Sequence, residues 1–439
     1  MTQQMHLGAF LFNLGNHIAG WRMPGVPTEG LMEFEFYRNL AETAERGKFD
    51  LIFHSDGLGI NDSYDTVLRH TVAIRPEPLT LLSALSVVTK RVGLAATIST
   101  SYNEPYHIAR KLGMLDFLSH GRAALNLVTS STDQEAQNFG QIRHLSHAAR
   151  YERAREFVDI LKLLWDSWED GAVMFDKESG RVADPARIHA IDFRGKYLSV
   201  RGPLNIPRPP QGHPIIIQAG VSADGQDFAA HVADIVFSVE RSLASAQSFY
   251  AAAQKRVVAA GRRKDAMKIM PGPLPIIGRT QAEADAKDRA LQDLVPESLA
   301  VSYLSDIVQH DLTHYPIDGP LPDLPASNGE MGRRQMILDE ANVAGTTIRS
   351  LAVKMVQNRG HLRIVGTAVK IADFMEDWFK KGACDGFNIL APFHPGALEE
   401  FVDEVVPELQ HRGLFRKDYQ GITLRDHLGL PRCNDRNRT

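Results

Sequence analysis

The sequence predicts an α/β fold, a (β/α)8 TIM barrel with long insertions. Short apolar runs typical of buried strands alternate along the chain with longer runs whose apolar residues recur at helical spacing. This alternation indicates a parallel sheet whose strands are joined by helices. Eight strand runs occur, which fits a closed barrel better than an open doubly wound sheet. No G-x-G-x-x-G motif follows the first strand, which weakens a dinucleotide-binding alternative.

The individual elements follow from the same periodicity. The predicted strands cover residues 5–12, 49–54, 92–97, 123–128, 214–219, 235–238, 268–277 and 386–390. The predicted helices cover residues 31–46, 79–89, 106–118, 147–168, 225–231, 244–260 and 367–381. Gly47 follows the first helix and Gly121 the third, and glycine is favoured just past helix ends because it adopts left-handed backbone angles readily.

Two stretches interrupt the alternation. Residues 171–212 are rich in proline, glycine and charge, and residues 302–360 contain a cluster of prolines between 316 and 325. Long stretches without regular structure inside a compact domain are commonly lids or binding loops. We therefore expect a single domain over residues 1–439, in which these two insertions form a lid and a substrate pocket.

Composition excludes several classes of function. The 439 residues include 49 Lys and Arg against 53 Asp and Glu, a formal net charge of -4 that gives no electrostatic footprint for nucleic acid or an anionic membrane. Two cysteines, Cys384 and Cys433, are too few for a disulfide framework. No basic leader with a long apolar run and no transmembrane-length apolar run occurs, so we expect a soluble cytoplasmic protein. His144 and His147 have no third ligand at a suitable spacing, so we expect no metal site.

Polar side chains stand at the ends of successive predicted strands. The candidates are Asp56 after the second strand, Thr97 at the end of the third, and Asn126 and Ser130 at the end of the fourth. Each alone is equally typical of a turn or a helix cap. Because the active site of a barrel lies at the carboxyl ends of its strands, the four together indicate a polar ligand pocket.

The segment 214–225 is the most specific local signal. An apolar run enters a turn at Gly220 and then a helix for which Ser222 is a suitable N-cap, a layout that presents backbone N–H groups to a phosphate. A capped turn without a ligand is the alternative. His147 and Tyr151 are four residues apart on one helix and so share a face, which suits a neutral donor pair for phosphate or an ordinary surface pair.

Ordered motifs along nearly the whole chain resemble those of the bacterial luciferase-like flavin monooxygenases. The resemblance is greatest to the branch that contains nitrilotriacetate, dibenzothiophene sulfone and long-chain alkane monooxygenases. The motifs are Gly47-Lys-Phe-Asp-Leu-Ile-Phe, Asp56-Gly-Leu, Ala96-Thr-Ile-Ser-Thr-Ser-Tyr102, Pro105-Tyr-His-Ile-Ala-Arg110, Asn126-Leu-Val-Thr-Ser130, His147-Ala-Ala-Arg-Tyr151, Gln218-Ala-Gly220, Asp385-Gly-Phe-Asn388 and Thr423-Leu-Arg-Asp-His-Leu-Gly429.

The resemblance implies a cofactor, partners and residue roles. It implies a barrel that binds reduced FMN from a separate NAD(P)H-dependent flavin reductase, uses O2 to oxygenate a small substrate, possesses luciferase-like insertions and forms a homodimer or homotetramer. By matched position, the residues that line the isoalloxazine and ribityl region would be Asp56, Thr97, Asn126 and Ser130. Those at the ribityl chain and phosphate would be His147, Tyr151 and Ser222, with Gly220 permitting close approach.

The sequence also offers candidate residues for substrate binding and catalysis. Arg69 and Arg75 lie on the segment after Asp56 and would favour a small anionic amine or thioether acid, because arginine binds carboxylates bidentately; an ordinary solvated loop is the alternative. The candidate catalytic histidines are His54, His17 and His314. For His54 the alternative is a satisfied buried histidine.

Two other functions remain open at this point. One is an oxidoreductase of the same superfamily that transfers hydride with deazaflavin F420, and the other is a flavin-binding protein without turnover. Dependence of substrate consumption on O2 separates them from a monooxygenase.

Overall fold

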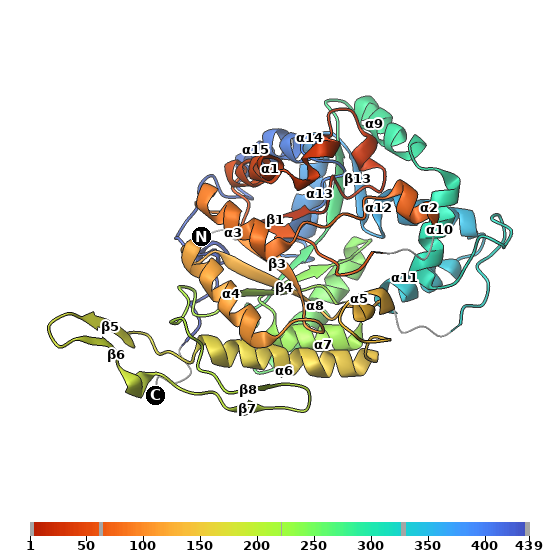
Figure 1. The fold of residues 1–439 in the computed structure, drawn as a ribbon. Helices are drawn as coiled ribbons and strands as arrows, with labels where there is room; N and C mark the ends of the chain where they lie inside the picture. Colours follow the sequence, from red (N-terminus) through yellow and green to blue (C-terminus); the bar gives the residue numbers. More distant parts are fainter. Residues whose placement is uncertain (1–3, 61–64, 221, 326–330, 435–439) are drawn as a thin grey trace.

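The computed structural model describes residues 4–60, 65–220, 222–325 and 331–434. Its centre is a sheet of eight parallel strands in the order β11-β10-β9-β4-β3-β2-β1-β14 (Figure 1). The strands are β1 (His6–Leu11), β2 (Leu51–His54), β3 (Gly93–Ser99), β4 (Ala123–Val128), β9 (Ile215–Gln218), β10 (Ile235–Ser238), β11 (Lys268–Pro271) and β14 (Gly386–Ile389). Each lies within a predicted strand or overlaps it closely, so the predicted barrel is confirmed.

The two end strands of this sheet, β11 and β14, lie side by side and nearly close the barrel. The backbone N–H of Asp385 donates to the carbonyl of Ile269 over 2.8 Å. The Asp385 carboxylate in turn accepts from the backbone N–H of Ile269, also over 2.8 Å. Between β11 and β14, the Asp385 carboxylate thus accepts a hydrogen bond that a backbone carbonyl would accept in a regular sheet.

Helices cover the outside of the barrel because each presents an apolar face to it. In α1 the buried side chains include Phe36, Leu40 and Ala44, which recur at the spacing of one helix face. The helices between barrel strands are α1 (Phe34–Arg46), α3 (Pro78–Val88), α4 (Pro105–Leu118), α6 (His147–Trp165), α7 (Ala223–Val232), α8 (Leu243–Ala259) and α13 (Ala368–Lys380). After β14 come α14 (Gly396–Glu400), a π-helix (Phe401–Val405), α15 (Val406–His411) and α16 (Leu424–His427).

The single strand predicted over residues 268–277 is wrong in one respect, because it is two strands that separate at Gly272. β11 belongs to the barrel, whereas β12 (Pro273–Ile277) pairs in parallel with β13 (Leu362–Gly366) in a separate two-stranded sheet. A Cβ atom at Gly272 would lie 2.3 Å from a ring carbon of Phe237. The backbone at Gly272 therefore lies too close to the barrel for a side chain, and β12 turns away from the barrel directly after it.

Residues 171–212 form two short hairpins. These are β5 (Val173–Asp176) with β6 (Arg181–Ala183), and β7 (Phe193–Arg194) with β8 (Ser199–Val200). The first hairpin, residues 173–183, projects from the body of the molecule beyond the end of α6, and we call it the β5–β6 arm (Figure 1). Met174, Phe175 and Val182 on this arm are 45%, 70% and 60% exposed.

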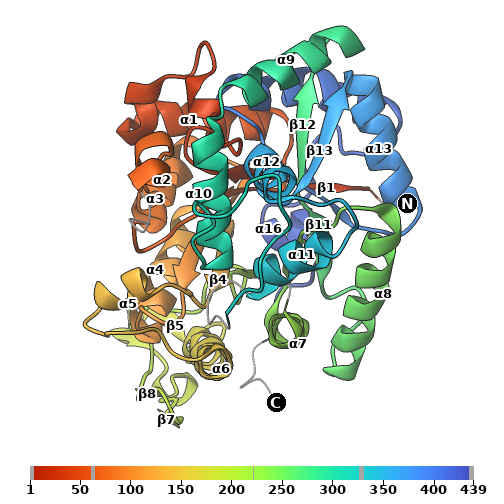
Figure 2. The same cartoon turned by 90° about the vertical axis from the view of Figure 1, so that its right-hand side faces the viewer.

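Residues 302–360 are largely helical and not the irregular stretch that their prolines suggested. The helices in and before this segment are α9 (Gln281–Asp293), α10 (Glu297–Val308), α11 (Met331–Ala341) and α12 (Ile348–Asn358). α10 and α12 pack through an apolar core of their own that includes Leu304, Leu351 and Met355. Seen along the barrel, α10, α11 and α12 lie in front of its strands (Figure 2). Two shorter helices, α2 (Asp65–His70) and α5 (Asp133–Gln137), also follow barrel strands.

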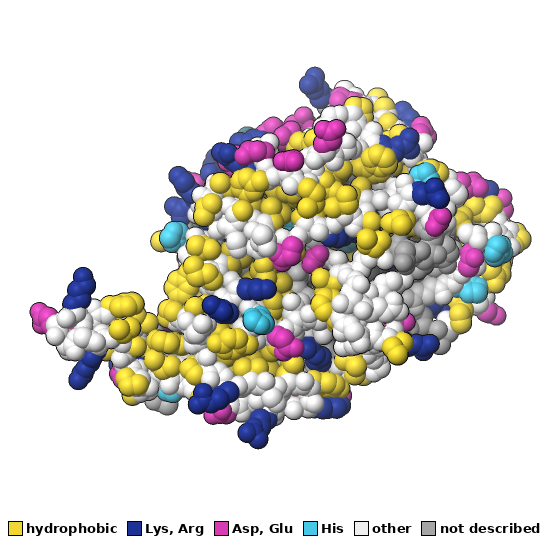
Figure 3. Space-filling model, viewed as in Figure 1, with side chains coloured by type: hydrophobic (Ala, Val, Ile, Leu, Met, Phe, Trp, Pro, Cys, Tyr) yellow, Lys and Arg dark blue, Asp and Glu magenta, His cyan; other side chains and the backbone are white. Residues whose placement is uncertain are grey.

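The surface mixes charges of both signs. On the face drawn in Figure 3, basic, acidic and apolar side chains stand next to one another without a region of one charge. Within the described residues, no helix combines the length and the apolar character needed to cross a membrane.

Candidate active site

A cavity of about 2060 Å³ lies where the barrel strands end. Residues that follow β1, β2, β4, β9 and β10 form one side of it, and residues of α10, α11 and α12 contribute to another. Single-ligand pockets usually measure roughly 300–1,000 Å³. The cavity therefore has room for a cofactor together with a substrate. The helical segment 302–360 contributes to its wall, whereas no described residue of 171–212 does.

One end of the cavity is built by the turn between β9 and α7. The backbone N–H of Gly220 donates to Oε1 of Gln218 over 2.6 Å, which holds the turn. A Cβ atom at Gly220 would lie 2.6 Å from Nε2 of Gln218 and 2.9 Å from the Tyr151 hydroxyl. The backbone here thus packs so closely against these two polar groups that only glycine fits. Ser222 caps α7, since its Oγ accepts from the backbone N–H of Gly225 over 3.1 Å.

The helix α6 brings His147 and Tyr151 to the same turn. Nδ1 of His147 lies 3.0 Å from Oδ2 of Asp224 in the first turn of α7, and the two rings of the pair are centred 5.0 Å apart. Burial raises the pKa of Tyr151, which keeps its hydroxyl protonated and able to donate. The structure therefore brings together all four residues predicted for the phosphate end, at the positive end of a helix dipole.

A second polar group surrounds Ser130, which has a left-handed backbone with φ 49°. Its Oγ lies 2.9 Å from Oγ of Ser99 and 3.0 Å from Oε1 of Glu135. The Glu135 carboxylate also accepts from the backbone N–H of Leu58, so it ties the ends of β2 and β4 together. Glu135 lines the cavity, and sequence reasoning missed it because it stands in a short helix outside any strand end.

Thr97 and Asn126 lie in the barrel wall behind the cavity surface, and neither lines the cavity itself. The Thr97 hydroxyl donates to the carbonyl of His54 over 2.8 Å, and Nδ2 of Asn126 donates to that hydroxyl over 3.3 Å. Among the described residues, Oδ1 of Asn126 is buried and accepts no hydrogen bond.

The candidate catalytic histidines do not line the cavity. His54 and His17 are each 2% exposed, and burial lowers the pKa of both to about 4, so both are neutral near pH 7. His314 lies on the outer surface with its side chain 85% exposed, beside Asp311. His54 is buried, but its Nδ1 has no hydrogen-bond partner among the described residues, so it is not the satisfied histidine of the alternative. Asp56, two residues on, reaches the cavity instead.

The structure places only one of the two predicted substrate arginines at the cavity. Arg69 is on the outer side of α2, where it pairs with Asp65 one helical turn away, and it does not line the cavity. Arg75 does line it, with its guanidinium 4.6 Å from the centre of the Phe12 ring. Burial, and then the neighbouring guanidinium of Arg359, lowers the pKa of Arg75 to about 10.

Aromatic residues and a second arginine complete the wall, and sequence reasoning missed them. Phe237 stacks on His361 with ring centres 5.4 Å apart, and burial lowers the pKa of His361 to about 3. Arg359 lies 4.5 Å from the centre of the Phe12 ring. Phe12 directly follows β1, and this position at a strand end could have indicated it from the sequence. Arg359 carried no such signal because it lies in the predicted insertion 302–360, and His361 carried none because it directly follows that insertion and lies in no predicted strand.

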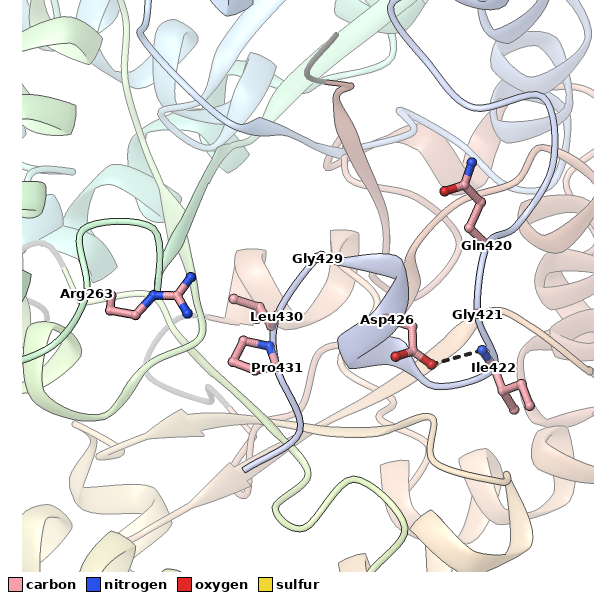
Figure 4. Close-up of a pocket in the computed structure, with 8 residues that line it drawn as sticks. All are labelled: Arg263, Gln420, Gly421, Ile422, Asp426, Gly429, Leu430 and Pro431. Atoms are coloured by element: carbon pink, nitrogen blue, oxygen red, sulfur yellow. Dashed lines mark hydrogen bonds between the residues drawn. The ribbon is translucent and has the colours of Figure 1, made fainter. Parts of the chain in front are cut away.

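A smaller hollow of about 660 Å³ lies at the chain's carboxyl-terminal segment (Figure 4). Its carboxylate, Asp426, accepts from the backbone N–H of Ile422 over 3.0 Å and caps α16. That carboxylate is structural. Within the described ranges, no group of three or more potential ligands could hold a metal ion.

Comparison with known proteins identifies the family. The model of the family described as luciferase-like monooxygenase matches residues 9–383. The chain is 47% identical over 431 residues to N-acetyl-S-(2-succino)cysteine monooxygenase of Bacillus subtilis (strain 168), with 98% of this chain and 97% of the relative covered. It is 44% identical over 442 residues to nitrilotriacetate monooxygenase component A of Aminobacter aminovorans, with 98% and 97% covered.

A solved structure agrees with these relatives. Riboflavin lyase, crystallised with modified FMN and its substrate riboflavin, matches with a TM-score of 0.89 and 29% identity over 97% of this chain and 96% of that chain. The barrel, the cavity at its strand ends and matches over nearly the full length agree, and the chain belongs to the luciferase-like monooxygenase family.

Proposed function

We propose that the chain uses reduced FMN and O2 to oxygenate a small organic substrate, with cleavage of a C–N or C–S bond where oxygen enters next to nitrogen or sulfur. Family membership and the structural neighbour crystallised with modified FMN support this proposal. The cavity of about 2060 Å³ has room for flavin and substrate together.

The turn at Gly220 is the observation that carries the proposal. A phosphate would be held there by the backbone, by the side chains of Ser222, His147 and Tyr151, and by the amino end of α7. The turn gathers these donors closely, because the Gly220 backbone lies against the Tyr151 hydroxyl and Gln218 with no room for a Cβ atom.

The ring and ribityl end is proposed to lie toward the other predicted residues. Asp56 and Ser130 are at the cavity wall, and Thr97 and Asn126 support it from behind. Asn126 would act there through Thr97, whose hydroxyl accepts from its Nδ2 over 3.3 Å.

Bound reduced FMN supplies the electrons that activate O2. The chain supplies the shape of the site and an aromatic part of its wall, because the rings of Phe10, Phe12 and Phe237 line the cavity. His361 stays neutral near pH 7 and so adds no charge to this apolar wall.

We infer that a separate NAD(P)H-dependent flavin reductase supplies the reduced FMN. The name of the relative from Aminobacter aminovorans, component A, supports a system of more than one protein. We infer further that the chain forms one folding unit, works in the cytoplasm, and assembles as a homodimer or homotetramer.

The proposal is tested by FMN binding to the wild type and to Gly220→Ala. Quenching of FMN fluorescence should give an affinity at least tenfold weaker for Gly220→Ala, because the added methyl group would displace Gln218 and the Tyr151 hydroxyl at this turn. Ser179→Ala, on the exposed turn of the β5–β6 arm, is the control and should bind FMN like the wild type.

Turnover is then measured with a flavin reductase, NADH and a substrate panel. We expect substrate-dependent O2 uptake and a product one oxygen heavier, or cleaved. Substrate consumption without O2 would favour the F420-type oxidoreductase, and FMN binding without turnover a non-catalytic flavin protein. Absence of FMN binding to the wild type would reject the proposal.

A further inference from the structure

Two arginine side chains lie against one phenylalanine ring in the cavity. The guanidinium carbon of Arg75 is 4.6 Å from the centre of the Phe12 ring, and that of Arg359 is 4.5 Å from it. All three residues line the cavity. Guanidinium groups stack on aromatic faces, which holds their planes in a defined orientation.

Neither guanidinium forms an ion pair with a carboxylate in the described part of the chain. Arg75 donates to the backbone carbonyls of Val72 and Ile74 over 3.0 and 3.2 Å. Asp56 is the acidic group that most favours the charge of Arg75, but the two do not form an ion pair. By contrast, Arg241 on the same cavity wall pairs with Glu340.

Arg359 is equally fixed by neutral groups. Its Nε donates to the carbonyl of Asn16 over 2.9 Å, and its guanidinium donates to the Tyr303 hydroxyl over 3.2 Å. It ends α12 with a left-handed backbone, φ 51°, so its position is set by the helical segment that covers the barrel.

This arrangement has an unmet electrostatic demand. Two like charges that are partly removed from water repel each other, and a bound anion relieves that repulsion. Each guanidinium has five N–H donors, and the contacts above use only some of them. The remaining edges suit bidentate contacts with carboxylates.

Resting on the proposed monooxygenase function, we propose that the substrate is an organic anion with at least two carboxylates, and that Arg75 and Arg359 bind them on the surface of the Phe12 ring. The remaining, less polar part of such a substrate would lie along the aromatic wall formed by Phe237 and His361. The substrate names of two relatives, nitrilotriacetate and N-acetyl-S-(2-succino)cysteine, denote compounds of this chemical class.

The flavin phosphate is the other anion that these arginines could bind. The Gly220 turn, elsewhere in the cavity wall, already provides donors for the phosphate. The phosphate therefore does not require the two arginines. The experiment separates the two, because FMN affinity and substrate affinity are measured independently on the same variants.

The variants are Arg75→Gln and Arg359→Gln, with Arg38→Gln on the exposed face of α1 as the matched control. The probes are nitrilotriacetate and N-acetyl-S-(2-succino)cysteine as polycarboxylates, and dibenzothiophene sulfone as an uncharged compound. Binding is measured calorimetrically on the protein with and without FMN, and KM is measured with the reductase present.

We expect each cavity variant to weaken polycarboxylate binding by about tenfold to hundredfold, the range of one charged hydrogen-bonded contact. The FMN dissociation constant should change less than threefold. Arg75→Lys and Arg359→Lys keep the charge but lose the planar fork, so they should fall between wild type and the glutamine variants. Circular dichroism checks that every variant is folded.

Other outcomes overturn the inference. An equal loss of FMN affinity in the cavity variants would assign the arginines to the phosphate. Unchanged polycarboxylate affinity in folded variants, or tighter wild-type binding of the sulfone than of the polycarboxylates, would reject the substrate class. Loss of FMN binding in the wild type would instead reject the proposed function, so the two failures are distinguishable.

Discussion

Asp56 is a carboxyl group of the cavity wall that changes charge within the usual working range of an enzyme. Burial raises its pKa to about 6, and the nearby Glu77 adds to this effect. A carboxyl whose pKa is raised in the folded state stabilises the protein below its unfolded pKa, and this stabilisation is lost as the pH rises through the folded pKa. The folded protein should therefore lose stability between pH 4 and pH 6 through this residue.

Asp56→Asn should remove that loss. Above pH 6 the variant should be more stable than the wild type by about 1–2 kcal/mol, a value reduced for the partial exposure of the side chain. Urea unfolding at pH 4, 5, 6 and 7 measures the difference, and Asp65→Asn on the exposed face of α2 is the control. Parallel curves for Asp56→Asn and wild type across this range would contradict the prediction.

At the residue scale, the sequence indicated which kinds of side chain a site could use better than it indicated which of them reach the cavity. Arg69 and Arg75 looked equivalent, being six residues apart on one predicted loop. The first lies on a helix whose phase turns it to solvent, and the second on extended chain that turns it inward. Helix phase and loop direction depend on tertiary packing, so spacing alone could not separate the two.

At the scale of elements, Gly272 lies at the point where the chain leaves the barrel strand β11 and begins β12. The peptide at this position passes between Phe237 and Leu390, where a Cβ atom would lie 2.3 Å from the first side chain and 2.6 Å from the second. The lack of a side chain lets β11 stay in the barrel while β12 turns to pair with β13.

Gly272→Ala should therefore lower the free energy of unfolding by about 1–3 kcal/mol, the usual cost of overpacking a core. The matched control is Gly57→Ala, because a Cβ atom there meets nothing within 4 Å. Guanidinium chloride unfolding compares the two variants with the wild type. Equal stability of the two alanine variants would show that the crossing is not sterically tight.

The barrel elements could be predicted because each βα unit carries its own local periodicity. The break at Gly272 and the strand β13 could not be, since both depend on contacts with residues far along the chain. Likewise the prolines near residue 320 suggested an irregular insertion, although the helices α11 and α12 begin after them. The turn proposed to hold the phosphate could be located from the sequence because strand, turn and helix follow one another locally, whereas Arg359 reaches Phe12 only through the fold.

At the scale of the whole molecule, the β5–β6 arm is the feature most suited to contact another chain. It projects from the body of the molecule (Figure 1). Its apolar side chains Met174, Phe175 and Val182 are exposed in the single chain. Exposed apolar side chains gathered on a projection typically mark a contact surface.

The double variant Phe175→Asn, Val182→Thr should shift the protein toward monomers in size-exclusion chromatography with light scattering. Asparagine suits the left-handed backbone of Phe175, φ 45°, so the hairpin should keep its shape. FMN affinity should be unchanged, because no arm residue lines the cavity. The control is Met32→Gln, which removes an exposed apolar side chain elsewhere on the surface. Unchanged assembly of the arm variant alongside the control would exclude this contact.

If assembly buries the projecting β5–β6 arm, the stability of each folded chain would depend on protein concentration. Association stabilises the folded state by mass action, so the midpoint of thermal unfolding rises with protein concentration when assembly buries such a surface. Dilution would then loosen the molecule without any change in its sequence, its solvent or its ligands.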